Sequence, residues 1–194
     1  MKQTGIRNCQ DMNRAVFLDR DGVIIQEPPH YIYRPDQLRL IPRTIEAIKL
    51  LNKNKFLVVV ISNQAGVAYG YYLEKDVILF NQLMKEELEL YDAKIDAIYY
   101  CPHHHNGKKK KYRTNCECRK PKPGMLKKAE KELNIDLKKS FMIGDKKSDI
   151  DCGNEVGCKT ILVLTGHGIE ELNNNIIECD FISKDLYHSI KYIL

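Results

Sequence analysis

The sequence predicts an α/β fold of three layers, in which a parallel β-sheet carries helices on both faces. Short apolar runs of strand length alternate along the chain with segments whose apolar residues recur at the helical period. Three of these apolar runs end in a short polar motif, as strands do where they reach a ligand site. The 194 residues suit one domain, so we expect a single domain over residues 1–194.

The expected elements follow the chain in alternation, which favours parallel strands joined by helical crossovers. Strands are expected at residues 15–18, 56–61, 95–100, 141–143, 159–164 and 180–183. Helices are expected at residues 42–54, 74–91, 124–133, 148–156 and 185–194. No internal repeat interrupts this order.

Composition and charge exclude several classes of protein. An apolar share of 43% and a charged share of 29% are ordinary for a globular protein. No apolar stretch approaches the roughly 20 residues of a membrane span, and residues 1–14 lack the apolar core of a signal peptide. The seven cysteines form an odd number, which argues against a secreted disulfide framework. We expect a cytoplasmic monomer that binds neither membranes nor nucleic acid.

The net charge of +5 comes largely from one basic stretch, residues 108–111 with Arg113. This stretch is either a solvated loop or a patch that attracts an anionic substrate. A basic zinc module that binds nucleic acid is the alternative from a different class. It would need phosphate contacts spread over the molecule and a steep salt dependence, whereas the basic residues cluster in one loop.

Two carboxylates stand where the first strand ends, in the run Asp19-Arg20-Asp21-Gly22. Side chains of an extended chain alternate between faces, so Asp19 and Asp21 can point the same way while Arg20 points elsewhere. Carboxylates brought together repel each other, and a divalent cation or a shared proton resolves the repulsion. Gly22 allows a sharp turn at this point.

Two later strands end in polar motifs of the same kind. The second strand runs into Ser62, Asn63 and Gln64, and the strand at 141–143 runs into a segment with Asp145 and Lys146. Because ligands bind beyond the carboxyl ends of parallel strands, we expect the three motifs to form one site. Asp149 is expected to orient Lys146 or to cap the next helix rather than to bind metal.

The segment 101–118 contains a pattern typical of a metal clip. Cys101 and His103 have Cys-x-His spacing, and Cys116 and Cys118 have Cys-x-Cys spacing, which together match a tetrahedral zinc site. Four protein ligands would leave no open position, so the zinc would be structural. His104 or His105 could replace His103, and the alternatives to a zinc site are reduced surface cysteines or a solvated histidine turn.

Two cations follow the clip directly. The ammonium group of Lys120 is suited to a phosphoryl oxygen. The planar guanidinium of Arg119 can donate two parallel hydrogen bonds to a second anionic group. Two prolines stiffen the chain after them, and Gly124 starts a helix.

The order of these motifs carries a resemblance to a known family. Asp-x-Asp-Gly, Ser-Asn-Gln, Lys-Pro-x-Pro and Gly-Asp-x-x-x-Asp, in that order, resemble the haloacid dehalogenase (HAD) superfamily of phosphatases. The clip that runs into Arg-Lys-Pro-x-Pro-Gly-Met is similar to the D-glycero-D-manno-heptose 1,7-bisphosphate 7-phosphatase family, with histidinol-phosphate phosphatases as near relatives. The resemblance covers residues 15 to about 168.

The resemblance implies a HAD-like, Rossmannoid fold without a large cap domain and a two-step phosphoryl transfer. Asp19 would be the nucleophile that forms an aspartyl phosphate, and Asp21 the general acid and base. Mg²⁺ would be held by Asp19, Asp145 and the main-chain carbonyl of Asp21. The phosphoryl group and substrate would be contacted by Ser62, Asn63, Gln64, Lys120 and Lys146. A small flap is expected at residues 27–31.

The resemblance also implies the substrate class, a phosphorylated sugar that loses its 7-phosphate. Histidinol phosphate is the rival substrate, but it carries an amine and an imidazole and so favours a pocket with carboxylates. Arg119 and the basic loop suit a second phosphate instead. Tyr69 stands where members of the heptose family tend to carry arginine, and His30 stands where they often show glycine.

Overall fold

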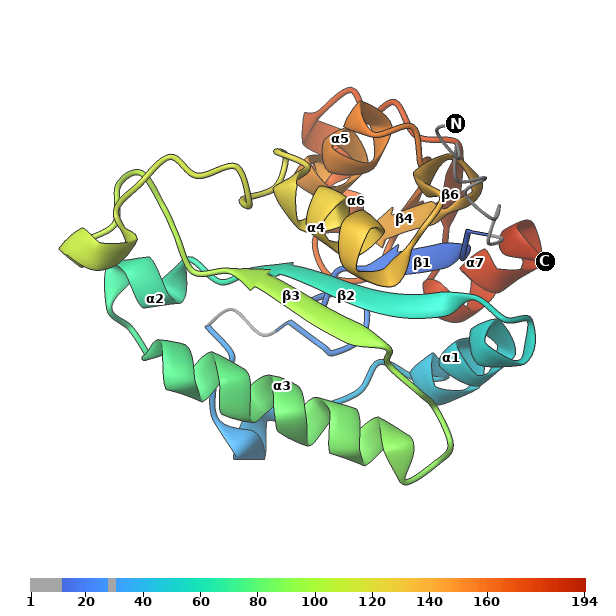
Figure 1. The fold of residues 1–194 in the computed structure, drawn as a ribbon, viewed down its shortest axis with the longest axis horizontal. Coiled ribbons are helices and arrows are strands. Elements are labelled where there is room, and N and C mark those ends of the chain that lie inside the picture. The colour runs from blue at the N-terminus through green and yellow to red at the C-terminus, as the bar shows by residue number, and fades with distance from the viewer. Residues whose placement is uncertain (1–11, 28–30) are drawn as a thin grey trace, which may run out of the picture.

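The computed structural model describes residues 12–27 and 31–194, and a six-stranded parallel sheet lies at its centre (Figure 1). The strands follow the order β3-β2-β1-β4-β5-β6. Their bounds are Ala15–Leu18 (β1), Leu57–Asn63 (β2), Ala97–Cys101 (β3), Phe141–Gly144 (β4), Lys159–Val163 (β5) and Phe181–Ser183 (β6). Strand β1 pairs with β2 on one side and β4 on the other.

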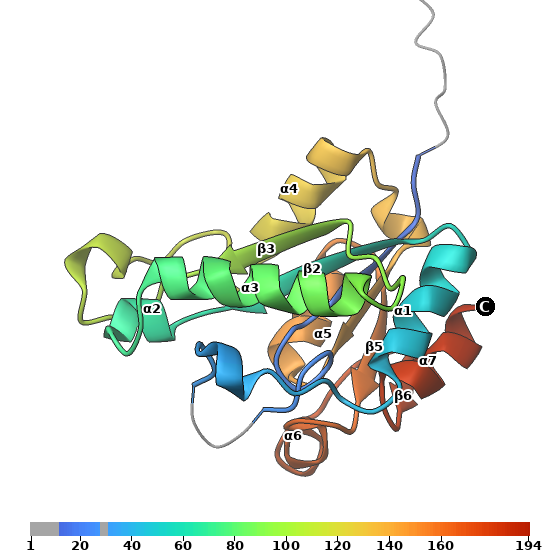
Figure 2. The ribbon, with the colours of Figure 1, turned by 90° about the horizontal axis from the view of Figure 1, so that it is seen from below.

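Helices cover both faces of the sheet, as Figure 1 and the perpendicular view in Figure 2 show. Helices α1 (Thr44–Lys53), α3 (Glu74–Glu89) and α7 (Leu186–Ile193) pack on one face, and α4 (Gly124–Leu133) and α5 (Lys147–Glu155) cover the other. Two short helices, α2 (Gly66–Tyr69) and α6 (Gly168–Asn174), follow β2 and β5. The predicted three-layer α/β fold is therefore confirmed.

The core divides into two layers because the side chains of each strand alternate between the faces. In β1, Val16 and Leu18 face the layer that contains α1, α3 and α7, whereas Ala15 and Phe17 face the layer that contains α4. All four side chains are fully buried. A strand apolar on both faces belongs at the centre of a covered parallel sheet, where β1 lies.

The predicted elements are all present, with shifts of at most two residues at their ends. Strand β2 continues to Asn63, so Ser62 and Asn63 belong to the strand itself rather than to the turn after it. Helices α2 and α6 were not predicted, because segments of four and seven residues are too short to display a helical period.

The described residues contain no inserted cap domain above the sheet, as the resemblance implied. Part of the predicted flap, residues 28–30, lies outside the described residues. None of the helices in the described ranges is long and apolar enough to cross a membrane.

Candidate active site

The predicted motifs converge at the carboxyl ends of the three adjacent strands β2, β1 and β4. Asp19 directly follows β1, Asn63 ends β2, and Asp145 directly follows β4. A cavity of about 660 Å³ opens at this edge of the sheet. It is lined by Asp19, Arg20, Asp21, Glu27, Tyr31, Ile32, Asn63, Gln64, Tyr72, Lys120, Lys146, Ser148, Asp149, Gly166 and His167.

Lys120 is a buried cation between two carboxylates. Its Nζ lies 2.9 Å from Asp19 Oδ1 and 2.6 Å from Asp149 Oδ1, and it also donates to the carbonyl of Ile61 at 2.9 Å. Burial opposes the charge, but Asp149 and Asp19 outweigh it and raise the pKa of Lys120. Lys120 is therefore a fixed positive charge beside Asp19.

Asp145 presents one carboxylate oxygen without a partner. Its Oδ2 accepts a hydrogen bond from the main-chain N–H of His167 at 2.8 Å, whereas its Oδ1 is buried and unpaired among the described residues. Oxygen atoms of Asp19, Asp145 and Asp149 lie within 4.8 Å of one another. A buried unpaired carboxylate oxygen among further carboxylates fits a divalent cation such as Mg²⁺.

The carboxyl groups of this cluster have shifted pKa values. Burial, aided by Asp19 and Asp149, raises the pKa of Asp145 to about 8 despite the nearby Lys146. Burial and Asp19 likewise raise the pKa of Asp149 to about 6, against the opposing effect of Lys120. A bound cation would favour the ionised forms that burial disfavours.

Asp21 is held by three donors on its two oxygens. Arg20 donates from Nε and Nη2 at 3.0 Å each, and Gln64 Nε2 donates at 2.9 Å. The expectation that Arg20 points away from Asp21 was wrong. The Arg20 guanidinium lies beside Asp21 because it also donates to Asn81 Oδ1 at 2.9 Å and stacks over the ring of Phe80.

The polar residues at the end of β2 are already engaged within the protein. Asn63 donates to the carbonyl of Lys120 and accepts from its N–H, both at 3.1 Å, so it fixes the main chain that carries Lys120. Ser62 Oγ accepts from Gln64 Nε2 at 2.8 Å, which leaves its own O–H able to donate. The amide oxygen of Gln64 accepts from Tyr72 Oη at 2.9 Å.

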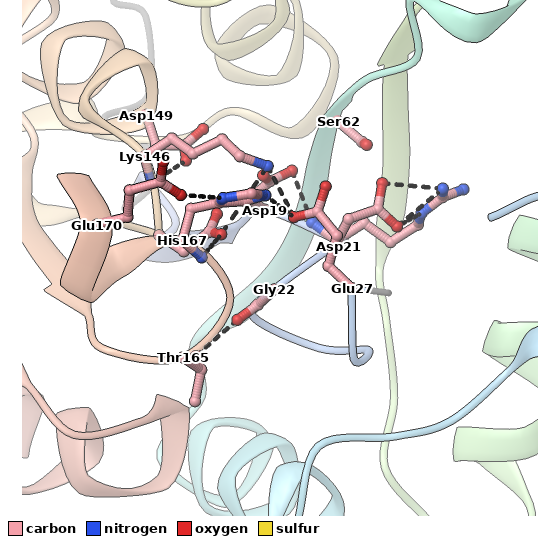
Figure 3. A network of polar contacts seen from close by, with 12 residues as sticks. Asp19, Asp21, Gly22, Glu27, Ser62, Lys146, Asp149, Thr165, His167 and Glu170 are labelled. Carbon is pink, nitrogen blue, oxygen red and sulfur yellow. Dashed lines mark hydrogen bonds and ion pairs between the residues drawn. The ribbon is translucent and has the colours of Figure 1, made fainter. Parts of the chain in front are cut away.

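Lys146 lines the cavity and belongs to a second polar group, with Glu27 and His167 (Figure 3). Its Nζ is 2.8 Å from Glu27 Oε2 and 3.9 Å from Asp145 Oδ2. Burial opposes the charge, but Asp145, Asp19 and Glu27 outweigh it and raise the pKa of Lys146. The imidazole of His167 approaches Glu27 at 3.5 Å and Glu170 at 3.1 Å.

Asp149 caps helix α5, because its Oδ2 accepts from the main-chain N–H of Lys146 at 3.1 Å. Its other oxygen binds Lys120. The capping role agrees with the sequence analysis, but the cation that Asp149 orients is Lys120 rather than the side chain of Lys146.

Cys101, His103, Cys116 and Cys118 meet in one cluster beside the end of β3. The three sulfur atoms lie 3.1–3.4 Å apart, and His103 Nδ1 is 3.4 Å from Cys118 Sγ. The hydrogen bonds that Cys118 shares with Cys101, Cys116 and His103 lower its pKa to about 5. Three thiols and one imidazole at this spacing fit a tetrahedral zinc ion.

The neighbouring residues of this loop lie outside the cluster. His104 contacts Tyr69, whose Oη is 3.0 Å from His104 Nδ1, so of the three consecutive histidines it is His103 that joins the sulfur atoms. Arg119 donates to the carbonyl of His103 at 3.3 Å and is absent from the residues that line the cavity.

Comparison with known proteins agrees with this arrangement. The HAD-hydrolase-like family model matches residues 117–189. A D-glycero-beta-D-manno-heptose-1,7-bisphosphate 7-phosphatase of Pasteurella multocida is 44% identical over 161 residues, which make up 82% of this chain and 86% of that protein. The chain belongs to the heptose-1,7-bisphosphate 7-phosphatase family.

Other members of this family match along almost the whole chain. A D-glycero-alpha-D-manno-heptose-1,7-bisphosphate 7-phosphatase of Photorhabdus laumondii is 36% identical over 93% of this chain and 96% of that protein. The crystal structure of the D,D-heptose 1,7-bisphosphate phosphatase of B. bronchiseptica, complexed with magnesium and phosphate, superposes with a TM-score of 0.84. It is 29% identical and covers 93% of this chain and 97% of that one.

Sequence reasoning missed several residues of the cavity in this family member. Arg20 and Tyr72 act through Asp21 and Gln64, and nothing in their local pattern indicates those contacts. The run Thr165-Gly166-His167 follows the apolar strand β5, so it obeys the same rule of a strand that ends in a polar motif. That rule, applied to a fourth strand, would have found it.

Proposed function

We propose that the protein is a Mg²⁺-dependent phosphomonoester hydrolase that removes the 7-phosphate from D-glycero-D-manno-heptose 1,7-bisphosphate. The observation that carries the proposal is that Asp19 and Lys120 pair at the wall of one cavity, while the buried carboxylate of Asp145, with one unpaired oxygen among the described residues, lies within 4.8 Å of an Asp19 oxygen. This arrangement puts a nucleophile, a fixed cation and metal ligands within reach of one phosphoryl group.

In the first step Asp19 attacks phosphorus and forms an aspartyl phosphate, while the bond from phosphorus to the sugar oxygen breaks. Asp21 gives its proton to the leaving alkoxide. In the second step Asp21 takes a proton from water, which attacks phosphorus and releases phosphate and free Asp19. The contacts from Arg20 and Gln64 hold the Asp21 carboxyl group in place for both proton transfers.

Charge on the transferring group is stabilised from two sides. Lys120 supplies a cation beside the oxygen of Asp19, and the O–H of Ser62 can donate from the end of β2. Mg²⁺, held by Asp19, Asp145 and the main-chain carbonyl of Asp21, would neutralise phosphoryl charge when bound. Asn63 contributes by fixing the Lys120 main chain, and Lys146 and Gln64 line the cavity, where they would contact the substrate.

We propose that Cys101, His103, Cys116 and Cys118 hold a structural zinc ion and that residues 1–194 form one phosphatase domain. The clip precedes Lys120 by two residues, so zinc would order the segment that delivers this cation. The monomeric state and the cytoplasmic location stay predictions from the sequence.

The substrate assignment rests on the names of the family members together with the pairing of charges in the cavity. The relatives are named as phosphatases of heptose 1,7-bisphosphate, of the beta anomer in one case and the alpha anomer in another. Histidinol phosphate is less favoured because Glu27, a carboxylate that could take an amine, is paired with Lys146. Arg119 and residues 108–111 do not line the cavity, so their contact with a second phosphate stays a prediction from the sequence.

The test is phosphate release from both anomers of D-glycero-D-manno-heptose 1,7-bisphosphate, compared with histidinol phosphate, with and without Mg²⁺. The Asp19→Asn variant is the blank. We expect Mg²⁺-dependent release from one heptose anomer and none from the blank. Faster release from histidinol phosphate would agree with the proposed mechanism but contradict the proposed substrate. Turnover by Asp19→Asn would contradict the assignment of Asp19 as the nucleophile.

A further inference from the structure

The loop between β5 and α6 touches the candidate metal site at three points. Its last three residues, Thr165, Gly166 and His167, are called here the 165–167 loop. Figure 3 shows it beside Gly22, with Thr165 and His167 directed to different parts of the site. None of its side chains has a role in the phosphoryl transfer described above.

The first contact holds the turn that carries the two catalytic carboxylates. Thr165 Oγ1 donates a hydrogen bond to the main-chain carbonyl of Gly22 at 2.6 Å (Figure 3). Gly22 directly follows Asp21, whose own main-chain carbonyl is a proposed Mg²⁺ ligand. The bond therefore ties the main chain after Asp21 to the end of β5, a strand separated from β1 by β4.

The second contact selects one oxygen of Asp145. The main-chain N–H of His167 donates to Oδ2 at 2.8 Å, and Oδ1 stays buried and unpaired among the described residues. A carboxylate with one oxygen fixed by an N–H group can offer only the other oxygen to a cation without losing that bond.

The third contact is a close approach of main chain to carboxylate. Gly166 has a φ of +56°, and a Cβ atom there would collide with Asp145 Oδ2 and with Cα of Gly22. Gly22 has a φ of +85°, and a Cβ atom there would collide with Asp145 as well. The two turns and the carboxylate pack so closely that side chains are excluded from both glycine positions.

We propose that the 165–167 loop is a positioning element for the metal site. Thr165 fixes the turn after Asp21, and the His167 N–H fixes Oδ2 of Asp145 so that Oδ1 faces the cation. Gly166 allows both contacts at once. This inference rests on the Mg²⁺ site of the proposed function but is independent of the identity of the substrate.

The test measures the binding of Mg²⁺ alone by titration calorimetry, without substrate. We expect Thr165→Val to weaken Mg²⁺ binding about tenfold or more, as the loss of an outer hydrogen bond does in other metal sites. Thr165→Ser keeps the hydroxyl and should bind Mg²⁺ as the wild type does. Thr160→Val is the matched control, because Thr160 lies at the other end of β5 and its hydroxyl bonds Asn154 Oδ1 at 3.0 Å.

Two further variants separate the main chain from the side chain. Gly166→Ala should weaken Mg²⁺ binding at least as much as Thr165→Val, because the added methyl group displaces the Asp145 carboxylate. His167→Ala should keep the wild-type Mg²⁺ affinity, because the main-chain N–H remains.

The inference is overturned if folded Thr165→Val and Gly166→Ala proteins bind Mg²⁺ as tightly as the wild type, or if Thr160→Val weakens binding equally. If Thr165→Val does not fold, the Mg²⁺ affinity of Gly166→Ala is compared with those of the wild type and Thr165→Ser. Equal affinities of the three proteins would then overturn the inference. Failure of the substrate proposal would look different: the wild type would bind Mg²⁺ and the variants would rank as stated, but no heptose bisphosphate would be hydrolysed.

Discussion

The carboxylate–lysine site and the cysteine–histidine cluster are built on different parts of the fold. Asp19 and Asp145 directly follow two adjacent strands at the centre of the sheet, and Asp145 is fully buried. In the cluster, only Cys101 belongs to a strand, and that strand lies at the edge of the sheet. Cys116 and Cys118 lie in a loop and are partly exposed.

The difference shows what holds each site in place. The carboxylates are fixed by the pairing of central strands, so most of their geometry exists before any cation binds. The loop between His103 and Cys118 has one short helical turn, Lys110–Tyr112, so we expect the proposed zinc ion to contribute most of the order of its cysteines. Lys120 links the two sites, because it follows the cluster in sequence and pairs with Asp19 in space.

The largest expected effect is the loss of the proposed nucleophile, Asp19. Asp19→Asn keeps the shape of the side chain but cannot form the aspartyl phosphate, so kcat should fall on the order of 10⁴-fold or more. Phosphate release at saturating Mg²⁺ measures it. Asp151→Asn is the control, because Asp151 pairs with Lys147 in helix α5, outside the residues that line the cavity. Comparable losses in both variants would contradict the assignment.

Lys120→Met should lower kcat by about 10²- to 10³-fold, because it removes the cation that faces the phosphoryl oxygens. It should also cost about 3 kcal/mol of unfolding free energy, since Asp19 and Asp149 lose their buried partner. Kinetics and urea unfolding measure the two effects. Lys122→Met is the matched control, because Lys122 pairs only with the exposed Glu117 in the described structure. A wild-type kcat for Lys120→Met would show that phosphoryl transfer does not need a cation at this position.

Cys116→Ser tests whether the cluster supports the catalytic site from a distance. Loss of a zinc ligand should lower Tm by on the order of 5–10 °C and reduce activity about tenfold through displacement of Lys120. Differential scanning calorimetry, activity and zinc content measure the outcome. Cys179→Ser is the control, as Cys179 is also partly exposed but lies outside the cluster. Full stability and activity with no bound zinc would refute the structural role.

The last expected effect is the pH dependence of stability without Mg²⁺. The pKa of Asp145 rises from 3.8 to about 8 and that of Asp149 to about 6 on folding. The folded protein therefore binds more protons than the unfolded chain between about pH 4 and pH 8, and stability falls as the pH rises through this range. Mg²⁺ favours ionised carboxylates, so it should raise Tm more at pH 8 than at pH 6.

Thermal unfolding with and without Mg²⁺ at both pH values measures this effect. Asp145→Asn should abolish most of the pH dependence and most of the stabilisation by Mg²⁺. A Mg²⁺-induced rise in Tm that is the same at pH 6 and pH 8 would contradict the shifted pKa values.

The sequence predicted the fold class and the approximate bounds of every strand, because apolar periodicity is a local property of the chain. It also predicted which strand ends carry the polar motifs, and the structure brings Asp19, Asp145 and Lys120 together as expected. The cysteine and histidine residues with metal-ligand spacing meet in one cluster, with His103 as the imidazole. Short helices such as α2 left no periodic pattern to detect.

The partners of individual atoms were decided only by the tertiary structure. Arg20 bonds Asp21 because Asn81 and Phe80 of helix α3 anchor its guanidinium. Asn63 bonds the main chain of Lys120, 57 residues away, and the N–H of His167 reaches Asp145 across 22 residues. The sequence by itself determined which residues stand at strand ends. The order of the strands in the sheet determined which of those ends are neighbours, because contacts between distant segments depend on sheet order and register rather than on local pattern.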